Sequence, residues 1–463
     1  MQVLCNLPLE CFDERSALRG VELCTYGPAE RGHVDGVHFP PDVAFDPSTE
    51  DWATLQQRLP RGFRPDLVLV YWPDQDPLPL GLEQCEVPVV GVVSDYNLSL
   101  PYLVGLWPFF DALLCDRAGV PLFERLSFAG VRYWNQYAHK RPFHHVHPGI
   151  ARSIDLGFVG NLNPAVQRER APWLDRLRRL GHAGVRTEVH SGIRGADYGR
   201  FLSACRIGWN RSIRGELNLR AFEVPACGAL LLLEQGNLEV AEYFVPGEEC
   251  VLYGDDLETT VLELLADPLR LQRIAKAGHR RVQEHRLGNR LPQLCAELQR
   301  LPVQRPRSTP FERSLGRATA MLATWASGQA VAAAARHALQ LAPDDPRAQN
   351  LMALALLRWQ PGPSAAPAWQ LWQTALRQQP NYLPAAVNLQ ALARQTGSAE
   401  LVLATTTALD RCLPTTDWRS IDGPTLPLGY SATAVDRSLA LQDAIRQGTP
   451  AAFATACAMG SSA

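Results

Sequence analysis

Two arginines directly follow a predicted strand and are suited to holding phosphate groups. Residues 206–210 are predicted to form a strand that ends at Asn210, and Arg211 and Arg214 come next. Arginine forks pair bidentately with phosphate oxygens, and ligands of parallel α/β sheets bind beyond the carboxyl ends of the strands. We therefore expect Asn210, Arg211 and Arg214 to cradle a diphosphate.

The stretch from Asn218 to Gly228 is predicted to be a short amphipathic helix. Its apolar residues share one face, and Arg220 and Glu223 lie three residues apart on the other, so both can point into one pocket. Gly228 fits the left-handed position after a helix end, and the apolar run 229–233 suits a parallel strand covered on both faces. The alternative is an ordinary helix–strand unit with a solvated Arg–Glu pair.

A second strand-to-helix turn carries a glycine and an asparagine. Residues 154–159 are predicted to be a buried strand that runs into Gly160 and Asn161, and a helix is predicted at 165–180. Glycine lets the backbone approach a ligand closely, and a helix N-terminus favours an anion. The alternative is a plain turn without a ligand.

Asp95 is the first candidate for a general base. It follows a predicted buried strand at 87–94, so it belongs to the sheet edge where ligands bind. A structural aspartate that caps a turn is the alternative, and His139 and His33 are further candidates for the base.

Composition limits the class of protein. A chain of 463 residues is expected to hold two or three domains. The net charge of −2 gives no basic field, so we expect no nucleic-acid partner. The 11 scattered cysteines fit a reducing cytosol, and neither a signal sequence nor a membrane span is predicted. The expected location is the cytoplasm.

Alternating strands and helices predict two domains with parallel sheets wound by helices. We expect an acceptor-side Rossmann-like domain at 1–150 and a nucleotide-binding Rossmann-like domain at 151–300. Residues 301–310 are rich in Pro and Arg, which is typical of a linker.

The remaining residues, 310–463, are predicted to be all-α. Residues 338–346 are echoed by residues 375–383 at an offset of 37. This period is close to the roughly 34 residues of tetratricopeptide repeats, which the region resembles. Two clear copies are too few for a free-standing solenoid, so we expect this domain to pack on the rest of the protein.

Residues 218–228 have the pattern Asn-x-Arg-x-Phe-Glu-x-x-Ala-Cys-Gly, and a Leu-rich strand and a Pro-Gly-Glu-Glu turn at 246–249 follow them. This arrangement resembles the nucleotide-sugar site of GT-B glycosyltransferases. The match is to the branch of spore-maturation-type glycosyltransferases. The resemblance implies that Glu223 binds the ribose hydroxyls of the donor, with Arg220 and Asn218 near its diphosphate.

The same resemblance places the turn at Gly160 and Asn161 on the cleft, followed by an arginine, Arg168 or Arg170. It also implies catalysis without a metal or cofactor, with arginines and helix N-termini holding the departing diphosphate.

The sequence departs from the larger GT-B group in two places. That group carries two glutamates eight residues apart, but Gly215 lies eight before Glu223 and Glu216 is one residue out of register. We expect Glu216 to face outward, where it would favour the helix dipole. Pro225 removes one backbone donor and is expected to kink the helix. The stereochemical outcome of transfer stays open.

Two motifs suggest a metal, and we assign neither. His144, His145 and His147 lack a carboxylate or cysteine cluster and lie between prolines, which favours a hinge. Asp74 and Asp76 resemble the Asp-x-Asp of metal-dependent glycosyltransferases, but so short a motif often arises by chance.

The expected function is transfer of a sugar from a nucleotide-diphosphate sugar to a hydroxyl-bearing acceptor. The repeat region is expected either to hold a protein acceptor or to serve dimerisation. A sugar-nucleotide epimerase and a non-catalytic scaffold with a degenerate transferase domain are the alternatives.

Overall fold

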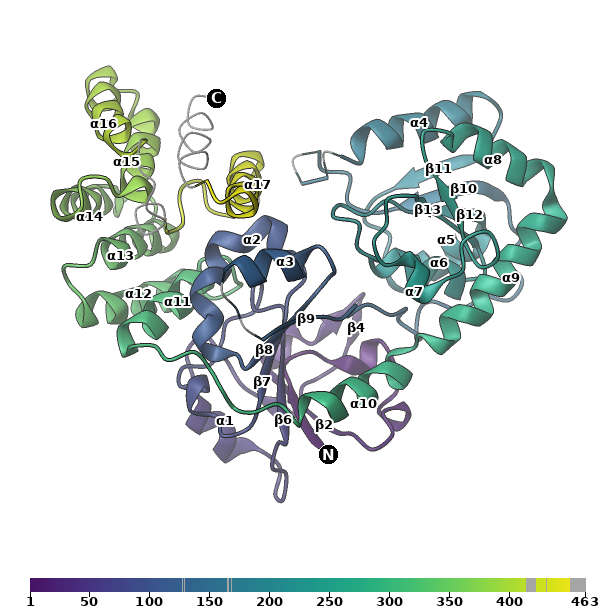
Figure 1. Ribbon diagram of the computed structural model, residues 1–463, viewed down its shortest axis with the longest axis horizontal. Coiled ribbons are helices and arrows are strands. Elements are labelled where there is room, and N and C mark those ends of the chain that lie inside the picture. The colour runs from purple at the N-terminus through teal and green to yellow at the C-terminus, as the bar shows by residue number, and fades with distance from the viewer. Residues whose placement is uncertain are drawn as a thin grey trace.

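The described residues of the computed structural model form two α/β domains and a helical domain, with the first α/β domain between the other two (Figure 1). The structure describes residues 1–126, 128, 130–164, 166–167, 169–413, 422–429 and 431–449. The expected fold class, two Rossmann-like domains followed by an all-α region, is confirmed. Whether the helices are tetratricopeptide repeats stays a prediction.

The first domain is built on a parallel sheet with the strand order β5-β2-β1-β6-β7-β8-β9. Its strands are β1 Gln2–Cys5, β2 Glu22–Gly27, β5 Val43–Ala44, β6 Leu67–Tyr71, β7 Val89–Val92, β8 Ala112–Cys115 and β9 Val131–Tyr133. The helices are α1 Trp52–Arg58, α2 Tyr96–Leu103 and α3 Gly119–Arg125, and a small antiparallel hairpin joins β3 His33–Val34 to β4 Val37–His38.

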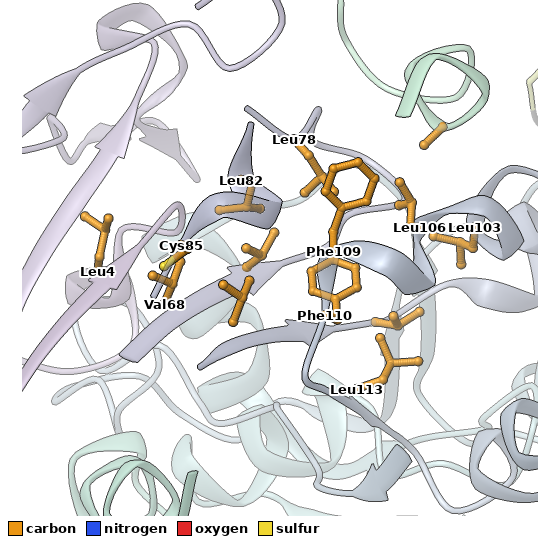
Figure 2. Close-up of a cluster of buried hydrophobic side chains, with 14 of the residues drawn as sticks. Leu4, Val68, Leu78, Leu82, Cys85, Leu103, Leu106, Phe109, Phe110 and Leu113 are labelled. Atoms are coloured by element: carbon orange, nitrogen blue, oxygen red, sulfur yellow. The ribbon is translucent and has the colours of Figure 1, made fainter. Parts of the chain in front are cut away.

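Alternate residues of the central strands enter different cores because side chains of a strand point to opposite faces. Leu4 and Val68 join one apolar cluster, whereas Val3 and Leu67 join the other. Figure 2 shows the first cluster, in which Phe109 and Phe110 lie beside the sheet. Burial on both faces explains why β6 is an uninterrupted apolar run.

The second domain has a parallel sheet with the order β11-β10-β12-β13-β14. Its strands are β10 Ile154–Val159, β11 Thr187–His190, β12 Cys205–Trp209, β13 Leu230–Glu234 and β14 Val251–Tyr253. Its helices are α4 Ala171–His182, α5 Gly195–Ala204, α6 Leu219–Ala226, α7 Val240–Tyr243, α8 Leu257–Ala266 and α9 Pro268–Glu284. The helix predicted at 165–180 begins only at Ala171, because Pro172 is suited to the first turn of a helix and not to its interior.

The chain returns to the first domain through α10 Leu287–Leu298 (Figure 1). Leu287, Leu291 and Cys295 of this helix are buried in a core that the first sheet also forms. The last helix of the segment 151–300, α10, therefore packs on the first domain. For this reason the domain boundary expected at residue 300 does not coincide with a boundary between the two hydrophobic cores.

The helical domain is fixed to the first domain. Its helices are α11 Pro310–Met321, α12 Gly328–Leu341, α13 Pro346–Trp359, α14 Ala365–Gln378, α15 Leu383–Thr396, α16 Ala399–Cys412 and α17 Ala432–Gln447. Gly316 of α11 crosses Gly105 so closely that a Cβ atom on Gly105 would lie 2.5 Å from Gly316 Cα. Only glycine allows this backbone approach.

The segment predicted to be a linker, 301–310, is held against the first domain by Arg305. Arg305 donates to the carbonyl oxygens of Cys85 and Val87, each at 2.6 Å, and pairs with Asp111 at 2.9 Å. Its side chain is almost fully buried. The composition at 301–310 thus marks an ordered strap and not a flexible connection.

Within the described ranges, no helix is long and apolar enough to cross a membrane.

Candidate active site

A cleft of about 710 Å³ lies between the two α/β domains, at the carboxyl ends of β10 and β12. Residues of both domains line it. The sequence-predicted residues among them are Asp95, Gly160, Asn161, Arg214, Asn218, Arg220 and Glu223. Asp95 and Glu223 therefore share one cavity although they come from different domains. Asn210 and Arg211 are not among the residues that line it.

Glu223 lies in the wall of the cleft on α6, and only 5% of its surface is exposed. Its Oε1 atom is 3.6 Å from Nδ1 of His144. That nitrogen accepts the backbone N–H of Lys140 at 3.2 Å, and burial lowers the pKa of His144 although Glu223 opposes the shift. His144 is therefore neutral, and Glu223 keeps its oxygens for a ligand.

Arg220 is held in one orientation. Its Nε donates to the carbonyl oxygen of Val159 at 2.9 Å, and its Nη1 donates to Oδ1 of Asn210 at 2.8 Å. A Cβ atom on Gly160 would lie 2.5 Å from Nη2 of Arg220. The space that glycine leaves is thus taken by the guanidinium, and Asn210, which is fully buried, orients Arg220 from behind.

A second arginine, Arg170, lies beside Arg220 in the cleft wall. The two guanidinium groups lie 5.5 and 4.3 Å from the centroid of the Phe158 ring, respectively. Burial lowers the pKa of Arg170 to about 9, and the positive charge of Arg220 is the second cause of this shift. Neither arginine forms an ion pair with a carboxylate of the described residues. Two neighbouring cations without a counter-ion form a site for an anion.

The sequence alone left Arg168 and Arg170 as alternatives at this place. Arg170 lines the cleft, with its Nη2 donating to the carbonyl oxygen of Arg211 at 2.8 Å. Arg168 lies outside the described residues. The expected role of Arg211 in the diphosphate cradle is not supported, because its guanidinium stacks on Trp173 at 4.4 Å and does not line the cleft.

Arg214 joins the two domains. Its Nε donates to Oδ2 of Asp116 at 2.9 Å, and its other nitrogens donate to Oδ1 of Asn97 and to the carbonyl oxygen of Ser94. These acceptors belong to the first domain and occupy most of the guanidinium. Arg214 therefore acts chiefly as an interdomain tie and not as the open phosphate ligand that we expected.

Asp95 lies on the opposite side of the cleft with 43% of its side chain exposed. Its Oδ1 is 3.9 Å from Nη1 of Arg214. Partial removal of water by the surrounding cleft walls raises the pKa of Asp95, and Arg214 acts in the opposite direction. The carboxylate is accessible to a hydroxyl group, as a general base requires.

The two histidine alternatives for the base lie elsewhere. His139 is 2% exposed, and burial lowers its pKa to about 3, with His144 as the next cause. It does not line the cleft. His33 stacks on His38 with 4.5 Å between ring centroids and lines a different pocket.

Lys140 is a cleft residue that the sequence did not single out. Its Nζ lies 2.6 Å from Oδ2 of Asp35. Burial alone would lower the pKa of Lys140, but Glu223 and Asp35 raise it, so the amine is charged. The sequence feature that could have pointed to Lys140 is the rarity of lysine, since the chain contains only one other lysine, Lys276.

Glu216 faces inward, which corrects the outward orientation that we expected. It is 6% exposed, and its carboxylate accepts the backbone N–H groups of Ile213 and Arg214 at 3.3 and 2.7 Å. Its carboxylate fixes the loop that carries Arg214.

The Asp-x-Asp and histidine motifs do not line the cleft. Asp74 is fully buried, and burial, with Asp95 next, raises its pKa to about 7. Asp76 accepts a hydrogen bond from Trp325 Nε1. In the part of the chain that the structure describes, no three His, Cys, Asp or Glu side chains gather as metal ligands.

Residues 146–296 match a family model described as glycosyl transferase-like. The match includes Arg170, Arg220 and Glu223. The second domain therefore resembles a glycosyltransferase domain. No protein of curated function matches the chain by sequence.

Several solved structures resemble the chain in fold. Sucrose-phosphate synthase of Thermosynechococcus elongatus is 13% identical with a TM-score of 0.40, covering 64% of this chain and 98% of that one. HepE of Anabaena in complex with UDP is 14% identical with a TM-score of 0.43, covering 64% and 99%. An α-glucosyltransferase in complex with UDP-glucose and DNA is 10% identical with a TM-score of 0.46, covering 64% and 98%.

Proposed function

We propose that this protein is a glycosyltransferase that moves a sugar from a nucleoside-diphosphate sugar to a hydroxyl group without a catalytic metal. The observation that carries the proposal is the pair Arg170 and Arg220, two neighbouring cations that form no ion pair with a carboxylate of the described residues. A departing diphosphate supplies the missing negative charge. Glu223 lies on the same wall and is assigned to the ribose hydroxyls of the donor.

The reaction needs a proton acceptor on the other side of the donor. Asp95 takes the proton of the acceptor hydroxyl, and that oxygen bonds to the anomeric carbon. The bond between this carbon and the β-phosphate oxygen breaks, and the diphosphate leaves with the electron pair. Arg170, Arg220 and Lys140 neutralise the charge that develops on it.

The finer parts of the proposal are the site residues and the partners. Gly160 and Asn210 shape and orient Arg220, while Asn161 and Asn218 contribute polar groups to the donor side of the cleft. A protein acceptor held by the helical domain, a homodimer and a cytoplasmic location stay predictions.

A screen of nucleoside diphosphates and their sugars by thermal shift, in buffer with EDTA, tests the proposal. One nucleotide series is expected to raise the melting temperature, because a ligand that binds only the folded state stabilises it. Incubation with the matching sugar nucleotide and a hydroxyl-bearing acceptor should then release the nucleoside diphosphate as the sugar passes to the acceptor or to water. Product in which an altered hexose stays joined to the diphosphate would instead indicate an epimerase.

A further inference from the structure

A second pocket of about 200 Å³ lies at the carboxyl ends of β1, β2 and β6 of the first domain. We call it the Trp325 pocket, after the residue of the helical domain that forms part of its wall. Its volume is below the roughly 300–1,000 Å³ of sites that take drug-sized ligands. A volume of this size suits a ligand group of about one ring.

Trp325 is fixed in the wall of the pocket by the loop after β6. Its backbone N–H donates to the carbonyl oxygen of Gln75 at 3.3 Å, and its Nε1 donates to Oδ1 of Asp76. The guanidinium of Arg31 lies 4.6 Å from its ring centroid. The helical domain therefore contributes a side chain to a pocket of the catalytic half of the molecule.

The chemistry of the wall suits a neutral ring with hydroxyl groups. Tyr26, Phe39 and Trp72 add aromatic surface to that of Trp325, and Asp76 and Arg31 add an acceptor and a donor group. Asn6 Nδ2 donates to Oδ2 of Asp76 at 3.3 Å, which holds the carboxylate in place. Pockets of apolar surface with a few fixed polar groups bind ligands that combine both properties.

The Trp325 pocket adjoins the donor cleft. Val34 lines the pocket, whereas the next residue, Asp35, lines the cleft, so one short hairpin separates them. Trp72 Nε1 donates to Gln136 Oε1 at 2.6 Å, and Gln136 Nε2 donates to the carbonyl oxygen of Val93 at 3.0 Å. Val93 is two residues from Asp95, so these two hydrogen bonds connect the wall of the pocket to the segment that carries the proposed base.

Two buried asparagines of the helical domain are hydrogen-bonded to the backbone of a later segment of the chain. Asn350 of α13 and Asn388 of α15 are both fully buried. Asn350 Nδ2 donates to the carbonyl oxygen of Pro424 at 3.1 Å, and Asn388 Oδ1 accepts the backbone N–H of Leu426 at 2.6 Å. These two side-chain amides are therefore already bonded to the chain's own backbone and leave no open contact there for an extended polypeptide.

We propose that the helical domain serves the acceptor site through Trp325, and that the acceptor is a hydroxyl-bearing ring of single-sugar size and not an extended polypeptide. This inference rests on the proposed glycosyltransferase function. The ring enters the Trp325 pocket as a free sugar or as the end of a glycan, and one of its hydroxyl groups reaches toward Asp95.

Binding of methyl hexopyranosides, followed by ligand-observed NMR on the full chain, tests the proposal. At least one glycoside is expected to bind the wild-type protein. Trp325→Ala is expected to weaken its binding by about tenfold, which corresponds to about 1.4 kcal/mol. Trp325→Phe is expected to weaken it less, because an aromatic ring is kept at this position. Trp359→Ala, at a residue 38% exposed in the same domain, is the matched control and should bind as the wild type does.

A peptide with the sequence of residues 422–429 and a panel of disaccharides complete the experiment. The peptide should not bind, and binding of disaccharides in preference to methyl glycosides would identify the end of a glycan as the source of the ring. Equal glycoside affinity of Trp325→Ala and wild type, absence of glycoside binding to wild type, or saturable binding of the peptide would overturn the inference. Binding of the nucleoside diphosphate is also measured for each variant. No binding to the wild type would refute the proposed transferase. Unchanged binding to Trp325→Ala would show that this variant is folded.

Discussion

Arg214 Nε in the second domain donates to Asp116 Oδ2 in the first domain over 2.9 Å, and only 9% and 11% of the two side chains are exposed. This pair lies where the walls of the cleft meet. The relative position of Asp95 and Glu223 depends on it, because Arg214 also binds Asn97 and Ser94 on either side of Asp95.

Replacing Arg214 with Ala is expected to cost about 3–5 kcal/mol in the free energy of unfolding, since it leaves the buried Asp116 without its partner. Denaturant titration measures the loss. The control is Arg117→Ala at the same domain interface, where the pair with Glu242 is 44% and 40% exposed. Exposed pairs contribute about 0–1 kcal/mol. A loss from Arg214→Ala as small as that of the control would contradict the role of an interdomain tie.

Arg170→Ala and Arg220→Ala are each expected to weaken binding of the nucleoside diphosphate by about ten- to a hundredfold. A hydrogen bond to a charged group contributes about 1.5–3 kcal/mol. Affinity for the nucleoside without phosphates should not change, because neither arginine is assigned to it. Calorimetry of both ligands separates the two effects. Arg178→Ala, at an exposed arginine paired with Asp175, serves as the control, and equal weakening of nucleoside and diphosphate would refute the assignment.

Asp95→Asn is expected to lower the rate of transfer by about 10²–10⁴ with donor affinity unchanged, since a general base contributes about that factor. In the wild-type protein, transfer should fall as pH decreases through the pKa of Asp95, because the protonated acid cannot accept the hydroxyl proton. Burial raises that pKa, so the acid limb should lie above the usual range of an aspartate. Steady-state rates between pH 4 and pH 8 provide the test, and full activity of Asp95→Asn would eliminate it as the base.

Asp74→Asn is expected to stabilise the protein at pH 8. Asp74 is fully buried, its oxygens lack hydrogen-bond partners among the described residues, and its pKa is raised from 3.8 to about 7. The folded state holds this proton more tightly than the unfolded state, so stability is lost as pH rises from about 4 to about 7.

At about 1.36 kcal/mol for each pKa unit, this loss amounts to roughly 4 kcal/mol. Denaturant titrations at pH 5 and pH 8 should therefore show a smaller decrease for Asp74→Asn than for the wild type. Asp175→Asn, at a side chain 62% exposed, should behave like the wild type. An Asp74→Asn variant that loses the same stability between the two pH values would show that Asp74 is not the group responsible.

Local pattern was sufficient to predict the elements that carry the donor site. The apolar spacing and Gly228 define α6 and the strand after it, and Gly228 has the expected positive φ of 75°. The carboxyl-end rule placed Asp95 at the edge of the sheet that faces the cleft. These features depend on residues that are close in sequence or on a general property of parallel sheets.

Contacts between distant parts of the chain were not predicted. Arg214 was assigned to phosphate because its partners, Asn97 and Asp116, come from another domain. The helix predicted at 165–180 begins only at Ala171, with Pro172 in its first turn, and the sequence left Arg168 and Arg170 as alternatives for the arginine of the cleft. The position of Trp325 depends on the packing of the whole helical domain against the first domain, which no local spacing encodes.

Calorimetric titration of the matching nucleoside diphosphate into wild type and Glu223→Ala, in the presence of EDTA, tests the central claim most directly. We expect a single site in the wild-type protein and affinity about tenfold weaker or worse in Glu223→Ala, with Glu263→Gln at an exposed position of α8 as the control. Unchanged affinity of Glu223→Ala, or no binding to wild type, would contradict the assignment of this cleft to a sugar nucleotide.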